Sequence, residues 1–277
     1  MVPAPGLGPM VGAMGVLARH DAHVSGNADG PTLVLAHGFG CDQSMWRYVA
    51  PAFERSHRVV LFDHIGAGGS DLGSYDPKRY GRLQGYADDV VALVEAVGGP
   101  VVLVGHSVSA MVGVLAAGSR PDLFERLVLV CPSPRYVDDD GYRGGFSADE
   151  IDDLLTTMDA NYLGWAQFIA PVIVGRPDRP ELAQELANSF CRTDPAIGRH
   201  FARTTFLSDN REDVARVAVR TLVVQSRVDA IAPPQVGRWV HEHLQDSEMV
   251  LLDAVGHCPN LSSPEALVAV LRDFLGR

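Results

Sequence analysis

The chain has 277 residues, of which 47% are hydrophobic, and a formal net charge of -11. This length suits one large core with an inserted subdomain, and the composition excludes a disordered or fibrous protein. Acidic residues are spread along the chain without any Lys/Arg cluster, which argues against nucleic-acid and membrane partners and favours small molecules or proteins.

The N-terminal stretch is dominated by Gly and Pro, which predicts a flexible extension over residues 1–16. No basic region precedes its apolar part, and no run of about 18 apolar residues follows anywhere in the chain. We therefore expect a cytoplasmic protein.

Short β-branched runs recur along the chain and predict strands. They lie at 32–37, 58–63, 100–105, 126–131, 220–226 and 249–253. Each run is continuously apolar, as strands buried on both faces are. Helical patterns lie between several of them, for example over residues 84–99, where an apolar stripe ends at two glycines. This alternation predicts an α/β fold with a mostly parallel central sheet and helices on both faces.

The stretch from 133 to 212 interrupts this alternation. It contains four helical patterns and no convincing strand, and the patterns lie at 147–162, 164–174, 179–190 and 194–206. Ser147 begins an S-x-x-E capping pattern, and Asp194-Pro195 forms a cap followed by proline at the first helical position. We predict an α/β core of residues 17–132 and 213–277, with a helical lid inserted over residues 133–212.

The four cysteines lie far apart and form no C-x-x-C pair: Cys41, Cys131, Cys191 and Cys258. This spacing predicts reduced, buried thiols and suggests neither a disulfide framework nor a structural zinc site. Nothing in the sequence requires a metal ion or an organic cofactor.

A near match to the nucleophile motif Gly-x-Ser-x-Gly begins at Gly105, with Ser109 in place of the second glycine. Ser107 follows a buried run and precedes a small, apolar helical pattern, which is the strand, turn and helix context of a nucleophile elbow. The substitution adds only a hydroxymethyl group, so we expect the turn to survive if φ at Ser109 is not positive. Such motifs also arise by chance in chains rich in Gly and Ser, but the context favours a nucleophile.

A serine nucleophile needs a base, and the base needs an acid that orients it. Asp229 follows the strand predicted at 220–226, and His257 follows the strand predicted at 249–253. Taken alone, Asp229 is better explained as a turn or cap residue and His257 as a structural histidine. Together they appear in the order Ser, Asp, His, each after a strand at the carboxyl edge of a parallel sheet, which predicts a catalytic triad.

The oxyanion formed by serine attack needs preorganised N–H donors. The amide of Val108, directly after the nucleophile, is one candidate donor. The second is expected in the segment AHGFG at 36–40, most naturally the amide of Phe39. A simple glycine turn would also explain this segment, although two glycines flanking an aromatic residue after a buried strand suit backbone donors.

These residues together resemble the α/β-hydrolase superfamily, in the group that contains the bacterial sigma-factor regulator RsbQ and the plant karrikin and strigolactone receptors. The similarity covers roughly residues 17–275 and rests on segments such as HGFGCDQSMW, VVLFDHIGAGGSD, GHSVSAM and GHCPNLSSP. GHSVSAM is the form found in the receptor branch, where the serine is an active nucleophile. FGCDQSMW and FCRTDPAI are more similar to the bacterial regulator, so both branches stay open.

The resemblance implies a four-helix, V-shaped lid whose aromatic residues line an apolar pocket over the serine. Carried over by motif, the lining residues are Phe39, Tyr136, Phe146, Trp165, Phe190 and Phe206. Ile169 stands where the receptors carry phenylalanine, so we expect a different pocket shape. For each aromatic residue, packing within the lid is an equally good explanation.

Two functions of different kinds follow. The first is a serine hydrolase that cleaves a small apolar ester or lactone, with His257 as base and then acid. The second, motivated by the resemblance alone, is a signalling protein that binds or slowly hydrolyses a small molecule and acts on a protein partner. That partner is a PAS-domain phosphatase in the bacterial branch and an F-box protein in the plant branch. Lyase, acyl-transfer or C–C hydrolase chemistry with the same triad stays open, whereas dehalogenases and epoxide hydrolases of this fold carry a carboxylate at the elbow.

Overall fold

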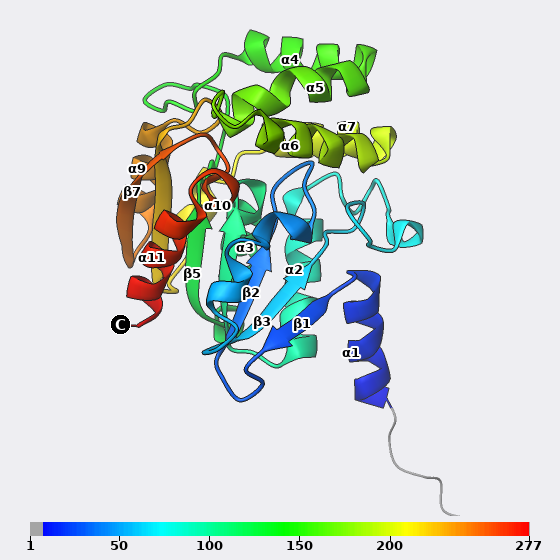
Figure 1. The fold of residues 1–277 in the computed structure, drawn as a ribbon, viewed down its shortest axis with the longest axis vertical. Helices are drawn as coiled ribbons and strands as arrows, with labels where there is room; N and C mark the ends of the chain where they lie inside the picture. Colours follow the sequence, from blue (N-terminus) through cyan, green and yellow to red (C-terminus); the bar gives the residue numbers. More distant parts are fainter. Residues whose placement is uncertain (1–7, 277) are drawn as a thin grey trace, which may run out of the picture.

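A seven-stranded sheet forms the centre of the computed structural model, which describes residues 8–276 (Figure 1). The strands in chain order are β1 His23–Gly26, β2 Thr32–Ala36, β3 Arg58–Phe62, β4 Val101–His106, β5 Phe124–Val130, β6 Thr221–Val228 and β7 Ser247–Val255. Their order across the sheet is β1-β3-β2-β4-β5-β6-β7, and every pairing is parallel except that of β1 with β3. The predicted mostly parallel sheet is therefore confirmed.

The first strand, β1, was not predicted from the sequence. Its four residues are all exposed, and it pairs only at the edge of the sheet, antiparallel to β3. A strand of this kind lacks the buried apolar run that identified the other six strands.

Two hydrophobic cores lie on opposite faces of the sheet. Leu33 and Leu35 of β2 belong to one core, and Val34 and Ala36 belong to the other. Alternate side chains of a strand point to opposite faces, which explains why this strand is apolar throughout. The helices that cover the faces are α1 Gly8–Arg19, α2 Leu83–Val97, α3 Val108–Ser119, α8 Arg211–Val214, α9 Pro234–His243, α10 Pro259–Ser262 and α11 Pro264–Leu275.

The N-terminal region differs from its prediction. Residues 8–16, expected in a flexible extension, belong to helix α1. The helix forms because Val16 and Leu17 pack against the core beside α2, and this tertiary contact outweighs the low helix propensity of its glycines. The remaining part of the predicted extension, residues 1–7, lies outside the described residues.

Four helices form the inserted segment: α4 Ala148–Ala160, α5 Tyr162–Val174, α6 Pro180–Arg192 and α7 Pro195–Phe206. They gather at one end of the molecule, at the top of Figure 1. The predicted caps are present, because Ser147 and Glu150 form a reciprocal capping box and Asp194 accepts hydrogen bonds from two amides of the first turn of α7. We refer to residues 133–212 as the lid.

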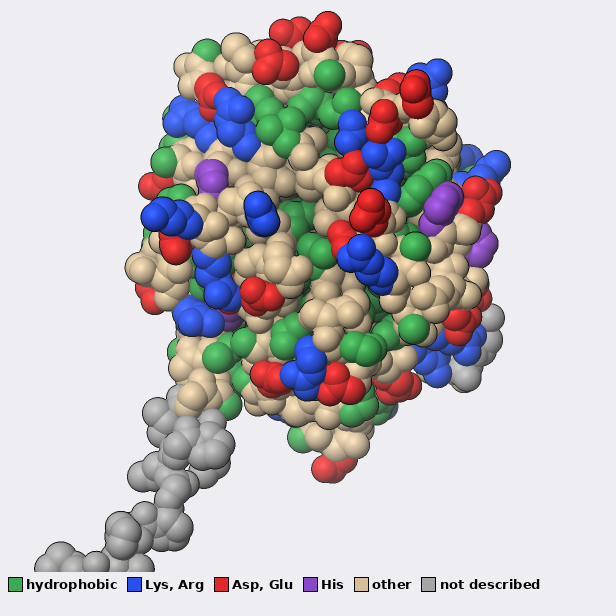
Figure 2. Space-filling view, turned by 180° about the vertical axis from the view of Figure 1, so that it is seen from behind, with side chains coloured by type: hydrophobic (Ala, Val, Ile, Leu, Met, Phe, Trp, Pro, Cys, Tyr) green, Lys and Arg blue, Asp and Glu red, His purple; other side chains and the backbone are tan. Residues whose placement is uncertain are grey.

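Charged side chains of both signs are interspersed on the face seen in Figure 2. Many charged side chains of the structure form ion pairs; for example, Arg135 and Arg211 both contact Asp209, at 2.8 and 2.7 Å. All four cysteines are free; Cys41, Cys131 and Cys258 are buried as predicted, whereas Cys191 is only partly buried. None of the helices within residues 8–276 has the length and apolarity needed to cross a bilayer.

Candidate active site

Ser107 lies in the sharp turn between β4 and α3. Its φ of 58° and ψ of -121° are strained for a residue with a side chain. The Ser107 amide donates a hydrogen bond to the Val130 carbonyl at 2.8 Å, which holds the turn against β5. A Cβ atom on Gly105 would lie 2.3 Å from the Ser109 carbonyl oxygen, so only glycine allows the strand and the helix to approach this closely.

Ser109, the residue that departs from the motif, is accommodated inside α3. It is buried, and its backbone is helical, so its φ is not positive. Its hydroxyl lies 2.7 Å from Nε2 of His64 and donates to the carbonyl oxygen of His37. Burial and the neighbouring histidines hold the pKa of His64 well below its usual value, so the ring is neutral and donates from Nε2 to Ser109.

Removing this hydroxyl is expected to affect stability far more than activity. The variant Ser109→Ala leaves the His64 donor and the His37 acceptor buried without a partner, which lowers the free energy of unfolding by about 1–3 kcal/mol. The elbow itself is unchanged, so kcat/KM should stay within about fivefold of the wild type, less than 1 kcal/mol of transition-state stabilisation. Urea unfolding and ester hydrolysis measure the two effects. A stable Ser109→Ala protein without activity would contradict this role.

The three residues of the predicted triad are brought together by the fold. Nε2 of His257 lies 2.8 Å from Oγ of Ser107, and Nδ1 of His257 lies 2.8 Å from Oδ2 of Asp229. All three are buried, with 4 to 7% of each residue exposed. This geometry allows His257 to accept the hydroxyl proton while Asp229 fixes the orientation of the ring.

Asp229 is held by a set of backbone donors. Its Oδ1 accepts hydrogen bonds from the amides of Ile231 and Ala232 at 2.8 and 3.0 Å, and Gln225 donates to Oδ2 at 3.3 Å. Burial alone would raise its pKa, but His257 and these amides outweigh burial and keep the pKa below its usual value. Asp229 is therefore ionised at neutral pH.

A buried thiol lies beside this pair. Cys131 lies close enough to Asp229 and His257 for the ligand atoms of all three residues to fall within 4.8 Å of one another. Burial raises the pKa of the Cys131 thiol well above its usual value, which disfavours the thiolate that a metal ion requires. The His257 and Asp229 atoms are also hydrogen-bonded to each other, so the donor set fits a triad better than a metal site.

His106, which was not predicted from the sequence, holds the backbone of the base, His257. Its Nε2 donates to the carbonyl oxygen of His257 at 2.7 Å. Burial lowers the pKa of His106 to about 3, so the ring is neutral. A Cβ atom on Gly38 would lie 2.7 Å from its Nδ1, which places the ring between His257 and the loop after β2. Only the tertiary structure reveals this contact.

The two candidate oxyanion donors lie beside the serine. Val108 is the first residue of α3, and Phe39 lies in the loop after β2. Within residues 8–276, no oxygen atom accepts a hydrogen bond from either amide. The loop is close to the nucleophile, because a Cβ atom on Gly38 would lie 3.3 Å from Cβ of Ser107. Gly40 has a φ of +69°, and a Cβ atom there would overlap the ring of Phe190.

A small cavity of about 30 Å³ lies over Ser107 and His257. Of the predicted aromatic residues, Phe39, Tyr136, Trp165, Phe190 and Phe206 line it. Phe146 does not line the cavity; it is half-buried and packs against the hydrophobic core, the alternative considered for each aromatic. Ile169 does line it, as do residues that sequence reasoning missed, such as Leu154, Leu186, Thr205 and Ile231.

Tyr136 contributes a second hydroxyl near the nucleophile. The residue is 2% exposed, and its ring lies 5.0 Å from that of Phe206. Burial raises the pKa of the Tyr136 phenol, against the opposing effect of the Ser107 hydroxyl, so the phenol stays protonated. It is therefore able to donate a hydrogen bond toward a substrate bound at Ser107.

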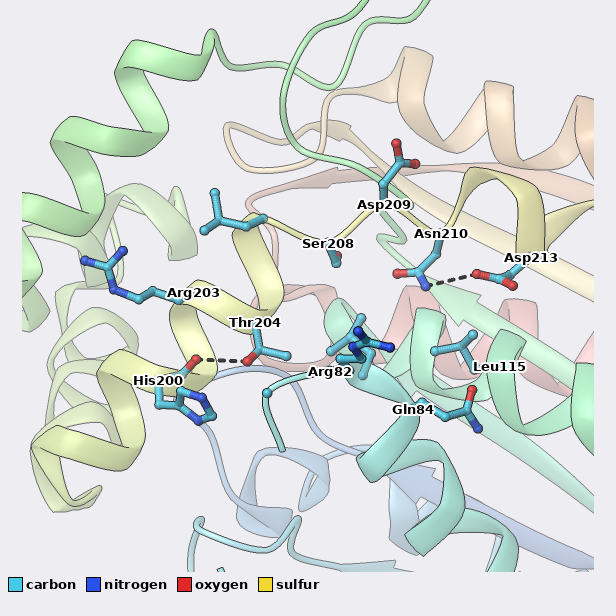
Figure 3. Close-up of a pocket in the computed structure, with 13 residues that line it drawn as sticks. Arg82, Gln84, Leu115, His200, Arg203, Thr204, Ser208, Asp209, Asn210 and Asp213 are labelled. Carbon is cyan, nitrogen blue, oxygen red and sulfur yellow. Dashed lines mark hydrogen bonds between the residues drawn. The ribbon is translucent and has the colours of Figure 1, made fainter. Parts of the chain in front are cut away.

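A larger groove of about 660 Å³ lies elsewhere, between the start of α2, α3, α7 and residues 208–213 (Figure 3). Its side chains are mostly polar or charged. Its hydroxyl and imidazole groups are already engaged, since Ser208 donates to the Thr205 carbonyl and His200 lies 2.6 Å from the Tyr75 hydroxyl. No serine and histidine of this groove form a hydrogen-bonded pair, so the chemistry points to the smaller cavity over Ser107.

Comparison with known proteins agrees with this fold. The sequence model of the alpha/beta hydrolase family matches residues 33–270. The chain belongs to the alpha/beta hydrolase family. The resemblance to the alpha/beta hydrolases and the fold inferred from the sequence are thus confirmed, and the protein is a hydrolase.

This alpha/beta hydrolase is similar to a plant esterase, a plant receptor and a hydrolase of known structure. "Strigolactone esterase D14" of Arabidopsis thaliana is 39% identical over 95% of this chain and 98% of its own length. "Karrikin insensitive 2 receptor CA" of Petunia hybrida is 38% identical over 93% of this chain and 96% of its own. The structure of a hydrolase from Oleispira antarctica has a TM-score of 0.93 at 37% identity, covering 96% of this chain and 97% of that one. The plant receptor group named from the sequence is among these relatives.

Proposed function

We propose that this alpha/beta hydrolase cleaves a small, largely apolar ester or lactone through an acyl intermediate on Ser107. The observation that carries the proposal is the continuous hydrogen-bonded chain from Asp229 through His257 to Ser107, which ends in a small, mostly apolar cavity. The names of its relatives, which include a strigolactone esterase, support ester or lactone chemistry.

The reaction begins when His257 takes the hydroxyl proton of Ser107 and Oγ attacks the substrate carbonyl carbon. The negative charge on the carbonyl oxygen is stabilised by the amides of Phe39 and Val108. The tetrahedral intermediate then breaks the C–O bond, and His257 returns the proton to the leaving alkoxide. A water molecule, deprotonated by His257, releases the acyl group; for a lactone, the leaving hydroxyl stays attached to that acyl group.

The cavity restricts the size of the acyl group. A volume of about 30 Å³ holds roughly two water molecules, since one water needs about 10–15 Å³ on this measure. Any substrate must therefore displace lining side chains, and longer acyl chains must displace more of them. Ile169 and Leu186 lie in this wall together with the aromatic residues.

A panel of p-nitrophenyl esters and butenolide lactones tests the proposal. We expect multiple turnover of the acetate and butyrate esters, with kcat/KM falling by at least about tenfold at octanoate, because repacking of the lid opposes its binding. Ser107→Ala serves as the blank for background hydrolysis. Absence of turnover above that blank for every ester and lactone would refute the proposed activity.

Ligand-dependent signalling is the second candidate function, and one surface feature favours it. Phe168 and Val172, one turn apart on the lid helix α5, are 72 and 41% exposed. Exposed apolar residues of this size on one helix face suit contact with a protein partner, and a relative is named "Karrikin insensitive 2 receptor CA". Slow turnover of one lactone with its mass retained on the protein would favour signalling, whereas fast turnover without an adduct favours a degradative enzyme.

A further inference from the structure

Thr205 is a polar residue in the mostly apolar wall of the cavity. It is the second-last residue of α7, it is 2% exposed, and it lines the same cavity as Ser107 and His257. In the part of the chain that the structure describes, its Oγ1 atom has no hydrogen-bond partner. Buried hydroxyl groups are normally hydrogen-bonded, so this one calls for an explanation.

The neighbouring residue shows the usual arrangement. Oγ1 of Thr204 lies 3.0 Å from the carbonyl oxygen of His200, one turn earlier in α7 (Figure 3), and 3.0 Å from that of Tyr80. A threonine hydroxyl in a helix commonly bonds to the carbonyl four residues before it. Thr205 makes no such bond with Phe201. The Thr204 hydroxyl therefore has a structural role, and the Thr205 hydroxyl has none.

The cavity around Thr205 is mostly apolar, and its few polar groups can each be named. Aliphatic and aromatic side chains form most of the lining. Besides Thr205, its hydroxyl and imidazole groups belong to Ser107 and His257, which bond to each other, to His106, which bonds to the His257 carbonyl, and to Tyr136. In such a pocket the few polar groups fix the orientation of the ligand, because a ligand oxygen placed elsewhere loses its hydrogen bond.

We propose that Thr205 binds a second oxygen atom of the substrate, separate from the scissile carbonyl. The preferred substrates are then small esters or lactones that carry an ether, hydroxyl or further carbonyl oxygen, rather than plain hydrocarbon esters. This inference rests on the proposed function and specifies its substrate class. It also explains why an otherwise unfavourable buried hydroxyl lies in the cavity.

The test compares ester pairs of nearly equal shape. In each pair one CH₂ group of the acyl chain is replaced by an ether oxygen, as in p-nitrophenyl butyrate and p-nitrophenyl methoxyacetate, and the oxygen is moved one position along the chain from pair to pair. The measured quantity is the ratio of kcat/KM for the ether to that for the hydrocarbon. Using a ratio cancels the general effect of a variant on catalysis.

The variants separate recognition from structure. Thr205→Val removes the hydroxyl at nearly constant volume, Thr205→Ser keeps it, and Thr204→Val removes the structural hydroxyl one residue away. For at least one pair we expect the ratio to fall by about tenfold in Thr205→Val, the loss of one hydrogen bond to a bound ligand, and to be kept in Thr205→Ser. Without ligand, Thr205→Val should be at least as thermostable as the wild type, whereas Thr204→Val should be less stable.

Two outcomes would overturn the inference while leaving the proposed function intact. One is turnover of the esters with unchanged ratios in Thr205→Val for every position of the oxygen. The other is a loss of thermostability in Thr205→Val as large as that in Thr204→Val, which would assign the hydroxyl a structural role. If the wild type hydrolysed no ester at all, the proposed function would fail first.

Discussion

The variant Ser107→Ala is expected to lose about 10⁴- to 10⁶-fold in kcat for p-nitrophenyl acetate, the range found when a serine nucleophile is removed. The hydroxyl is the atom that forms the acyl bond, and it lies 2.8 Å from its base. Alanine keeps the Cβ atom and the strained backbone of the turn, so the variant loses the reacting atom and little else. Steady-state kinetics with enzyme and blank measured side by side give this value.

Folding of the variant must be checked independently. The thermal midpoint of Ser107→Ala should lie close to that of the wild type, since His257, the partner that loses the hydroxyl, lines the cavity and keeps its hydrogen bond to Asp229. Ser109→Ala is the matched control in the same segment, because it removes a neighbouring hydroxyl that points away from His257. Comparable losses of activity in both variants would mean that the elbow itself had been disturbed.

The variant Asp229→Asn should reduce kcat by about 10³- to 10⁴-fold at neutral pH with little change in KM. The amides of Ile231 and Ala232 donate to Oδ1, so the asparagine must place its carbonyl oxygen there. Its NH₂ group then faces Nδ1 of His257 as a donor. His257 can accept that bond only with its own proton on Nε2, and in this tautomer it cannot take the proton of Ser107.

Asp253→Asn provides the matched control for this substitution. Asp253 lies on β7 with a side chain that is 92% exposed, and its partner is Arg227 at 3.1 Å. An exposed ion pair of this kind contributes at most about 1 kcal/mol, so turnover should be unchanged. Activity of Asp229→Asn within tenfold of the wild type would mean that His257 is oriented by something other than this carboxylate.

The sequence predicts the strands of the inner sheet well, because residues buried on both faces leave continuous apolar runs. The exposed edge strand β1 leaves no such signal. Helix α1 was also missed, because its stability comes from Val16 and Leu17 packing on the core and not from its own composition. Local sequence patterns therefore predict elements that are buried or capped. They fail for elements whose stability depends on tertiary contacts.

At the candidate site, too, some residues can be predicted from local patterns and others depend on tertiary contacts. The order of Ser107, Asp229 and His257, each after a strand, was enough to suggest that they meet, since parallel strands bring their carboxyl ends to one edge. His106 and Thr205 left no comparable signal. Their importance depends on one hydrogen bond to the His257 backbone and on one hydroxyl without a partner. Neither can be recognised before the distances are known.

Trapping the acyl intermediate shows whether Ser107 is the nucleophile. The wild type and Ser107→Ala are mixed with p-nitrophenyl acetate, quenched in acid within the first turnover, digested and analysed by peptide mass spectrometry. We expect one acetyl group on the peptide that contains Ser107 in the wild type, and none on that peptide in the variant. Rapid turnover by the wild type without any acylation of Ser107, with the acyl group found instead on another side chain, would contradict this expectation.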